Sequence, residues 1–146
     1  MPFPAATGRC EDGGCAVSTT TRRRATDVAN LIGGFVAAEG HFQARPVEGR
    51  FAFTVALGAA DREMVDLLHG FLGCGRTRWY ARRRPHYDDE VCFVVRGLSD
   101  LVEVIVPFMD EHLPRSYKRD QYGVWRAALL DYWEHDARCR RTTGRR

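Results

Sequence analysis

The hydrophobic and polar residues of the chain follow two periods in turn, and together they predict eight elements. Apolar side chains recur every three or four residues in four segments, as on one face of a helix, and on alternate residues in four others, as in a strand. The helical segments are 28–38, 62–72, 101–106 and the stretch that follows Ser116. The strand segments are 41–45, 50–57, 76–82 and 90–96.

Capping residues, glycines and a proline mark where these helices begin and end. Side chains that accept a hydrogen bond at a helix N-terminus stand before or at the start of each helical segment, namely Asp27, Asp61, Ser99 and Ser116. Gly40 and Gly73 stand where the first two helices are expected to end, and Pro107 is expected to interrupt the third. Short turns through 46–49 and 85–89 join the strands into two hairpins.

The element order predicts an α+β domain of the αββαββα(α) type. Hairpins place neighbouring strands antiparallel, so the sheet is expected to be antiparallel with its helices packed on one face. In segment 50–57, Phe51, Phe53, Val55 and Leu57 alternate with smaller residues, which gives that strand one apolar face. The opposite face of the sheet is then open to water or to a ligand.

The chain of 146 residues is long enough for one domain, which we place at 25–136. Residues 1–24 have no apolar period and end in three arginines, so they are expected to form a flexible basic tail, and 137–146 a second one. No apolar run reaches the roughly eighteen residues that a membrane helix needs. The first residues also lack the layout of a signal peptide, so we expect an intracellular, cytoplasmic protein.

Arginine dominates the basic residues. The formal net charge is only +3, but 21 of the 22 basic residues are arginine, and Lys118 is the single lysine. Arginine makes planar, bidentate contacts to phosphates and guanine edges that lysine does not reproduce. A GC-rich genome that favours arginine codons is the alternative explanation of this bias.

The cysteines point to a reducing environment and not to a metal centre. Cys10, Cys15, Cys74, Cys92 and Cys139 are odd in number and scattered, which favours free thiols. Cys10 and Cys15 have no second pair of cysteine or histidine nearby to complete a tetrahedral zinc site. Cys92 falls in an apolar run and is expected in the core.

A basic ribbon is expected in the second hairpin. Five arginines and no acidic residue occur in 76–84, and in a strand Arg76, Arg78, Tyr80 and Arg82 project from one face. Such a face suits a ribbon in the DNA major groove, and polar residues of the first hairpin would extend it. A solvated basic face is the alternative. The candidate DNA-binding residues are Gln43, Arg45, Arg50, Arg76, Arg78, Tyr80, Arg82, Arg83 and Arg84.

The first helix carries two glycines in its interior, Gly33 and Gly34. Each costs about 1 kcal/mol relative to alanine, so a close packing partner is expected to compensate. Small residues at helical spacing surround them and form the candidate dimer interface: Ala29, Gly33, Gly34, Ala37 and Ala38. A second copy of this helix could approach closely along that surface, and close packing inside one chain is the alternative.

Glu39 follows directly on this small-residue surface. A carboxylate at a helix C-terminus is unfavourable unless a cation compensates, and a divalent metal ion would do so. A two-fold axis through the small-residue surface would bring two Glu39 carboxylates together, and paired carboxylates with metal ions serve phosphodiester hydrolysis. A solvated surface carboxylate is the alternative.

The run Ile32-Gly33-Gly34-Phe35-Val36-Ala37-Ala38-Glu39-Gly40, followed by His41-Phe42, resembles the LAGLIDADG motif of homing endonucleases. The resemblance extends over about 27–133 through an MVDLL helix, a GCGR turn, an IVPF segment and the run from Leu113 to Lys118. It implies a LAGLIDADG-like fold and a Mg²⁺-dependent (or other divalent-metal) DNA endonuclease. Members with a single motif act as homodimers on nearly palindromic duplex DNA.

The resemblance also implies roles for individual residues. Glu39 matches the acidic metal ligand at the end of the motif, with the backbone carbonyl of Ala38 as a supporting ligand. Lys118 matches a lysine near the scissile phosphate, so Glu39 and Lys118 are the expected catalytic residues. Ala37 departs from the motif where an acidic residue is usual, and Leu57 stands where a polar residue, commonly glutamine, helps to position water.

Two other functions stay open, and the departures at Ala37 and Leu57 favour the first of them. One is a DNA-binding regulator, or an RNA-binding splicing helper, on the same scaffold without catalysis. The other is a small-molecule-binding α+β domain, in which Gly33 and Gly34 serve only internal packing. The first alternative predicts DNA binding without strand breaks, and the second predicts a monomer without salt-sensitive affinity for DNA.

Overall fold

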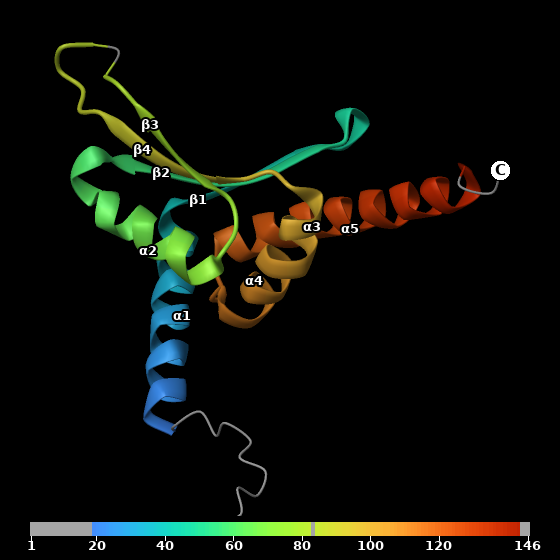
Figure 1. The fold of residues 1–146 in the computed structure, drawn as a ribbon, viewed down its shortest axis with the longest axis horizontal. Helices are drawn as coiled ribbons and strands as arrows, with labels where there is room; N and C mark the ends of the chain where they lie inside the picture. Colours follow the sequence, from blue (N-terminus) through green and yellow to red (C-terminus); the bar gives the residue numbers. More distant parts are fainter. Residues whose placement is uncertain (1–18, 83, 144–146) are drawn as a thin grey trace, which may run out of the picture.

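The structure is a computed structural model that describes residues 19–82 and 84–143. It consists of a four-stranded antiparallel sheet whose helices pack on one face (Figure 1), so the predicted α+β class is confirmed. The first half contains α1 (Thr19–Glu39), β1 (Gly40–Arg45), β2 (Arg50–Gly58) and α2 (Arg62–Leu72). The second half contains β3 (Arg76–Tyr80), β4 (Glu90–Val95), α3 (Leu98–Asp100), α4 (Val106–His112) and α5 (Tyr117–Thr143). A π-helical turn, η3 (Leu101–Ile105), joins α3 to α4.

The strands lie in the order β1-β2-β4-β3, so the two predicted hairpins sit side by side with β2 and β4 in the centre. Gly40 pairs with Val55 at one end of the first hairpin, and Arg45 pairs with Arg50 at its turn. Gly49 closes that turn at φ 63°, a left-handed conformation that glycine adopts without strain. β1 and β3 are therefore the edge strands of the sheet.

The core lies between the sheet and the helices. Alternate residues of β2 and β4 point into it, among them Phe53 and Phe93, which have no solvent exposure. Ile32 and Val36 of α1 reach the same core from below, and so does Leu68 of α2. The apolar face expected for β2 is thus the inner face of the sheet.

Both terminal helices are longer than the sequence pattern predicts. α1 begins at Thr19, so Asp27 lies inside the helix and residues 19–24 are helical, not part of an irregular tail. No glycine or proline occurs between Thr19 and Ile32, and arginine and alanine favour the helix. Residues 1–18, the rest of the expected tail, lie outside the described residues.

α5 likewise continues to Thr143, so residues 137–143 are helical, in contrast to the second expected tail. Two ion pairs at i, i+4 spacing support this last stretch, Glu134 with Arg138 and Asp136 with Arg140. Such pairs stabilise a helix whose apolar contacts have ended. Residues 144–146 lie outside the described residues.

The third predicted helix is not interrupted at Pro107. It begins at Leu98, one residue before the expected cap Ser99, and runs on to His112. The hydrogen-bond ladder widens to a π turn immediately before Pro107, at the point where the missing proline N–H would otherwise break it. Asp61 precedes α2 without a side-chain capping bond, whereas Ser116 caps α5 as predicted, because its Oγ accepts from Arg119 N at 3.2 Å.

Polar side chains fasten α5 to the end of α4. Arg119 donates to the carbonyl oxygens of Met109 and Asp110 in the last turn of α4, at 3.0 and 3.1 Å. The buried Tyr122 hydroxyl donates to Val106 O at 3.0 Å and to Asp110 Oδ1 at 2.8 Å. This clamp holds the first turns of α5 in a defined place against the sheet.

Tyr122→Phe should flatten the alkaline loss of stability. Burial and the hydrogen bond to Asp110 raise the pKa of Tyr122 above its ordinary value of 10.0. The phenol stays protonated in both states below about pH 10, and above it only the unfolded chain releases the proton, so the free energy of unfolding falls as the pH rises. Urea unfolding between about pH 8 and 11 should show that the free energy of unfolding falls less steeply with pH for the variant than for the wild type. At neutral pH the free energy of unfolding of the variant should be lower by about 1 kcal/mol. An unchanged alkaline slope would contradict the assignment.

Candidate nucleic-acid interface

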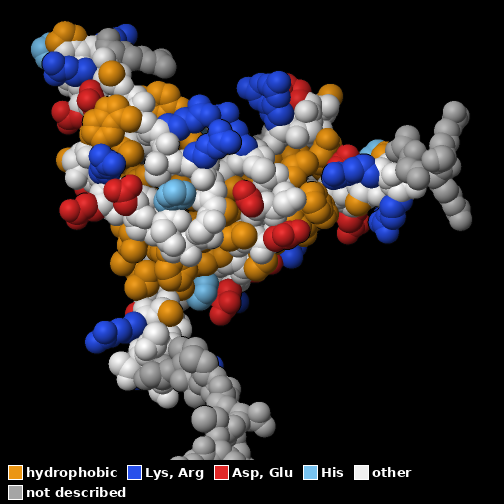
Figure 2. Space-filling view, in the orientation of Figure 1, with side chains coloured by type: hydrophobic (Ala, Val, Ile, Leu, Met, Phe, Trp, Pro, Cys, Tyr) orange, Lys and Arg blue, Asp and Glu red, His pale blue; other side chains and the backbone are white. Residues whose placement is uncertain are grey.

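The sheet face opposite the helices carries basic side chains around a floor of small residues. The strand register places Arg76 and Arg78 of β3 on this face, beside Val94 and Cys92 of β4. On β1, Gln43 occupies the same face opposite Ala52. Figure 2 shows Lys and Arg side chains gathered along the upper side of the molecule, over the sheet and its hairpins. This surface is called the arginine face below.

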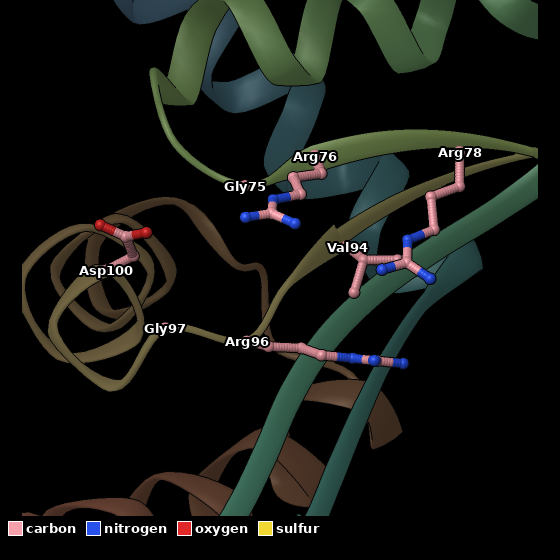
Figure 3. Close-up of a pocket in the computed structure, with 7 residues that line it drawn as sticks. All are labelled: Gly75, Arg76, Arg78, Val94, Arg96, Gly97 and Asp100. Atoms are coloured by element: carbon pink, nitrogen blue, oxygen red, sulfur yellow. The ribbon is translucent and has the colours of Figure 1, made fainter.

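Three shallow depressions cover the arginine face, and Arg96 lines all three of them. The largest has a volume of about 640 Å³ and lies over Thr54 and Cys92 in the middle of the sheet. In the close-up of Figure 3, Arg76, Arg78 and Arg96 surround Val94, and Asp100 stands on the adjoining helix. Arg96 was missing from the candidates, although it follows Cys92 and Val94 at strand spacing and that period identifies it.

The three arginines around Val94 form no ion pair with a carboxylate of the described residues. Among the described residues, ion pairs form at Arg45 and Arg50, which share Glu48 at 3.5 and 3.2 Å, but not at Arg76, Arg78 or Arg96. Like charges that are close together and unpaired favour the binding of an anion. The central arginines therefore form the part of the face best suited to a polyanion.

The tip of the second hairpin is held by one acidic residue. Asp89 accepts hydrogen bonds from Trp79 Nε1 at 3.2 Å and from the backbone N–H of Arg82 at 2.9 Å. β3 ends at Tyr80, so Arg82 and Arg84 lie in the loop beyond the strand and not on its face, while both still line the central depression. Arg83 lies outside the described residues. The predicted shared face is confirmed for Arg76, Arg78 and Tyr80.

Cys92 lies in the floor of the arginine face, not in the core between sheet and helices. Its side chain is nevertheless buried, as the sequence predicted, with 7% exposure. Burial raises the pKa of the thiol, nearby Glu90 raises it further, and Arg78 and Arg96 act in the opposite direction. A small, neutral side chain therefore separates the arginines.

Glu39 and Lys118 lie at the same end of the molecule. α5 runs along β1: its Tyr122 ring is tilted against the Phe42 ring with the centroids 5.3 Å apart, and Trp125 Nε1 donates to the Gln43 carbonyl at 2.9 Å. Lys118 lies about one helical turn before Tyr122 on α5 and so toward the start of β1, which directly follows Glu39 at the end of α1. Glu39 is exposed and forms no ion pair with the described residues.

The oxygen atoms at this end could provide some, but not all, of the ligands that a hard divalent cation needs. Glu39 offers carboxylate oxygens and the last turn of α1 offers free carbonyl oxygens, the ligand type that Mg²⁺ prefers. Among the described residues, however, no group of three or more His, Cys, Asp or Glu side chains could hold a metal ion. If Glu39 held a cation, a second carboxylate would therefore have to come from elsewhere.

The similarity of this chain to known proteins lies in its structure. No protein-family model matches the sequence, and no curated protein matches it significantly. The homing endonuclease I-GzeII, solved in complex with its DNA target, matches with a TM-score of 0.64 over 92% of this chain at 18% identity. I-SmaMI bound to uncleaveable DNA matches with a TM-score of 0.63 over 93% at 19% identity, and I-LtrWI bound to target DNA with 0.57 over 85% at 17%.

The chain has the fold of LAGLIDADG homing endonucleases. It spans only about two fifths of the length of these structures, 42%, 41% and 40% in the same order. The resemblance found in the sequence is confirmed as a resemblance of fold.

The structure divides the small-residue surface of α1, the motif helix of this LAGLIDADG fold, into two stripes. Ala29 and Gly33 are buried inside the chain, and a Cβ on Gly33 would stand 2.0 Å from the His112 carbonyl oxygen of α4. α4 occupies that side of α1, so within one chain these two residues pack internally, which is the alternative given for the small-residue surface. Ala37 is half-buried.

The second stripe of α1 faces outward. Gly34 and Ala38 are exposed, Leu31 is 58% exposed, and a Cβ on Gly34 would meet nothing within 4 Å. Asn30 lies beside this stripe and its amide oxygen is 3.0 Å from His112 Nδ1. A surface free for another helix thus exists, but it is narrower than the sequence suggested.

Leu57 lies on the helix side of the sheet, partly buried against the core. Gly40 pairs with Val55, so β2 continues past the end of α1 and brings Leu57 to the Glu39 end. An apolar side chain at this position cannot hold a water molecule by a hydrogen bond.

In the part of the chain that the structure describes, no helix is long and apolar enough to span a membrane.

Proposed function

We propose that the chain is a site-specific DNA endonuclease that cleaves phosphodiester bonds of a nearly palindromic duplex as a homodimer with a divalent metal ion, Mg²⁺ in the first place. The observation that carries the proposal is the arginine face, which has unpaired guanidinium groups on an endonuclease fold. The compared endonucleases were solved with DNA, which supports duplex DNA as the partner.

The dimer is inferred from the exposed stripe of α1. Leu31, Gly34 and Ala38 offer an apolar, small-residue stripe along which two α1 helices could pack closely. A two-fold axis there would place both copies of Glu39 at one end of the helix pair, which completes the partial donor set.

Each residue at this end then has a separate task. Glu39 and the Ala38 carbonyl would hold the cation, and the cation when bound would polarise the phosphodiester and activate water. The Lys118 ammonium would offset negative charge on the phosphate, from a helix start that Ser116 and Arg119 fix in place. The arginine face would select the site and hold the duplex against this end.

The central experiment is cleavage of a randomised duplex library with Mg²⁺ by the full chain. Double-strand breaks at one nearly palindromic sequence would support the proposal, and binding without breaks would refute the endonuclease. Leu57 favours this second outcome, because it is apolar at the Glu39 end. The second candidate is therefore a DNA-binding regulator or RNA-binding splicing helper, for which the same library bound without metal would report sequence preference.

Arg84→Gln should weaken binding equally for all sequences. Arg84 lies in the loop at the hairpin tip, where a side chain on the flank of the duplex would contact phosphates. Loss of one phosphate contact should lower the slope of log affinity against log salt by about 0.9. Fluorescence anisotropy on a selected and a scrambled duplex at several salt concentrations measures this, with Arg62→Gln on α2 as the control. A loss confined to the selected duplex would contradict a phosphate contact.

A further inference from the structure

We infer that Arg96 is a specificity-determining residue that reads a guanine in the DNA half-site, with Arg76 and Arg78 reading neighbouring guanines. The inference rests on the proposed function, since it assumes that the arginine face receives duplex DNA. It specifies the class of sequence recognised: a half-site rich in guanine in the stretch above the middle of the sheet. Arg96 is not among the residues that the sequence pattern alone suggested.

The first reason for this role is the position of Arg96 in the sheet. It directly follows β4, and because Phe53 pairs with Val95, Arg96 stands opposite Ala52 of β2. It therefore lies between the two hairpins, and it is the residue shared by all three depressions of the arginine face. Figure 3 shows its guanidinium extending from β4 across the neighbouring strands.

The second reason is that the sheet residues beneath these guanidinium groups are short. Ala52, Thr54, Cys92 and Val94 line the floor of the arginine face with short side chains, so base edges can approach the longer arginine side chains around them. When a sheet lies in a major groove, its central residues face base edges and its flanks face phosphates. Arg96 adjoins the central strand β4, and Arg76 and Arg78 lie on the edge strand β3 but pair with Val94 and Cys92 of β4, so they lie nearer the middle of the sheet than the loop residues Arg82 and Arg84.

The third reason is the hydrogen-bonding geometry of the guanidinium group. An arginine with no carboxylate partner keeps its planar fork of donors free, and that fork matches the O6 and N7 acceptors of guanine. Gln43 completes the row Gln43–Ala52–Arg96 across the sheet, and a carboxamide matches adenine in the same way. A purine-rich strand with guanine opposite the arginines fits this row.

The experiment is a selection of bound duplexes from a randomised library without metal, for the full-length chain and for Arg96→Lys and Arg96→Gln. The wild type should enrich guanine at the positions read by the arginine face. Arg96→Lys keeps the charge but loses the fork, so it should lose preference at one or two positions by roughly 5- to 150-fold and keep the salt slope. Arg84→Gln serves as the matched control for a phosphate contact.

The outcomes separate this inference from the proposed function. Equal weakening of all sequences by both Arg96 variants would make Arg96 a phosphate contact and overturn the inference, as would unchanged preferences. DNA binding by the wild type without guanine enrichment would also overturn it, while DNA as the partner would stand. Failure of the wild type to bind any duplex would overturn both. Arg96 is exposed, so its substitution leaves the core intact, and thermal unfolding verifies this.

Discussion

Glu39→Gln is expected to lower Mg²⁺-dependent cleavage by roughly a thousand-fold while DNA affinity stays within about two-fold of wild type. The substitution keeps the size of the side chain and removes the charge that would bind the cation. Glu39 is exposed at the end of α1 and supports no ion pair within the described residues, so folding should not change. Single-turnover cleavage of the selected duplex and anisotropy on the same duplex measure the two quantities.

A matched variant removes a carboxylate from elsewhere on the surface. Asp66 of α2 is exposed and pairs only with Arg62 of the same helix, so Asp66→Asn should cleave as the wild type does. Full cleavage by Glu39→Gln would refute Glu39 as the metal ligand. Loss of DNA binding together with cleavage would instead assign Glu39 to the binding surface.

Gly33→Ala and Gly34→Ala are expected to have opposite effects, although the two glycines are adjacent. A methyl group on Gly33 would collide with the His112 carbonyl, 2.0 Å away, and backbone cannot yield as a flexible side chain does. Overpacking of about 3 kcal/mol, set against about 1 kcal/mol gained in helix propensity, predicts a net loss of about 2 kcal/mol in the free energy of unfolding. Urea unfolding at a concentration where the chain is monomeric measures it.

Gly34→Ala meets open space in one chain, so the monomer should gain up to about 1 kcal/mol. If two α1 helices pack along Gly34, the added methyl groups keep them apart, and the dimer dissociation constant should rise roughly ten-fold. Sedimentation equilibrium distinguishes these effects. A variant that is more stable and equally dimeric would remove Gly34 from the interface, and a wild type that stays monomeric with its DNA would refute the dimer itself.

Gly33 and Gly34 also show which parts of the fold could be predicted from the sequence and which could not. The order of helices and hairpins could be predicted because strand and helix periods differ clearly and because glycines end α1 and α2. The direction in which Gly33 points could not, since a stripe of small residues looks the same whether α4 or another copy covers it. Only the packing of His112 against α1 distinguishes the two.

The ends of the terminal helices were missed for a related reason. Residues 19–24 and 137–143 have no apolar period, and a period is what marks a helix that packs on a core. Their helical structure comes from local propensity and i, i+4 ion pairs. Arg96 stands outside the run of arginines in 76–84, and it joins them only because the sheet brings together strands that are distant in sequence.

The edge strands of the sheet have a consequence for any experiment on the arginine face. An unpaired edge can accept a strand from another molecule, which leads to aggregation. On β1, Trp125 occupies the Gln43 carbonyl, but every residue of β3 is exposed and Arg76 and Arg78 supply its charge. Repulsion between these arginines keeps two β3 edges apart. Neutralising both to weaken DNA binding would therefore also expose the edge, so such variants need a solubility control before their loss of affinity is interpreted.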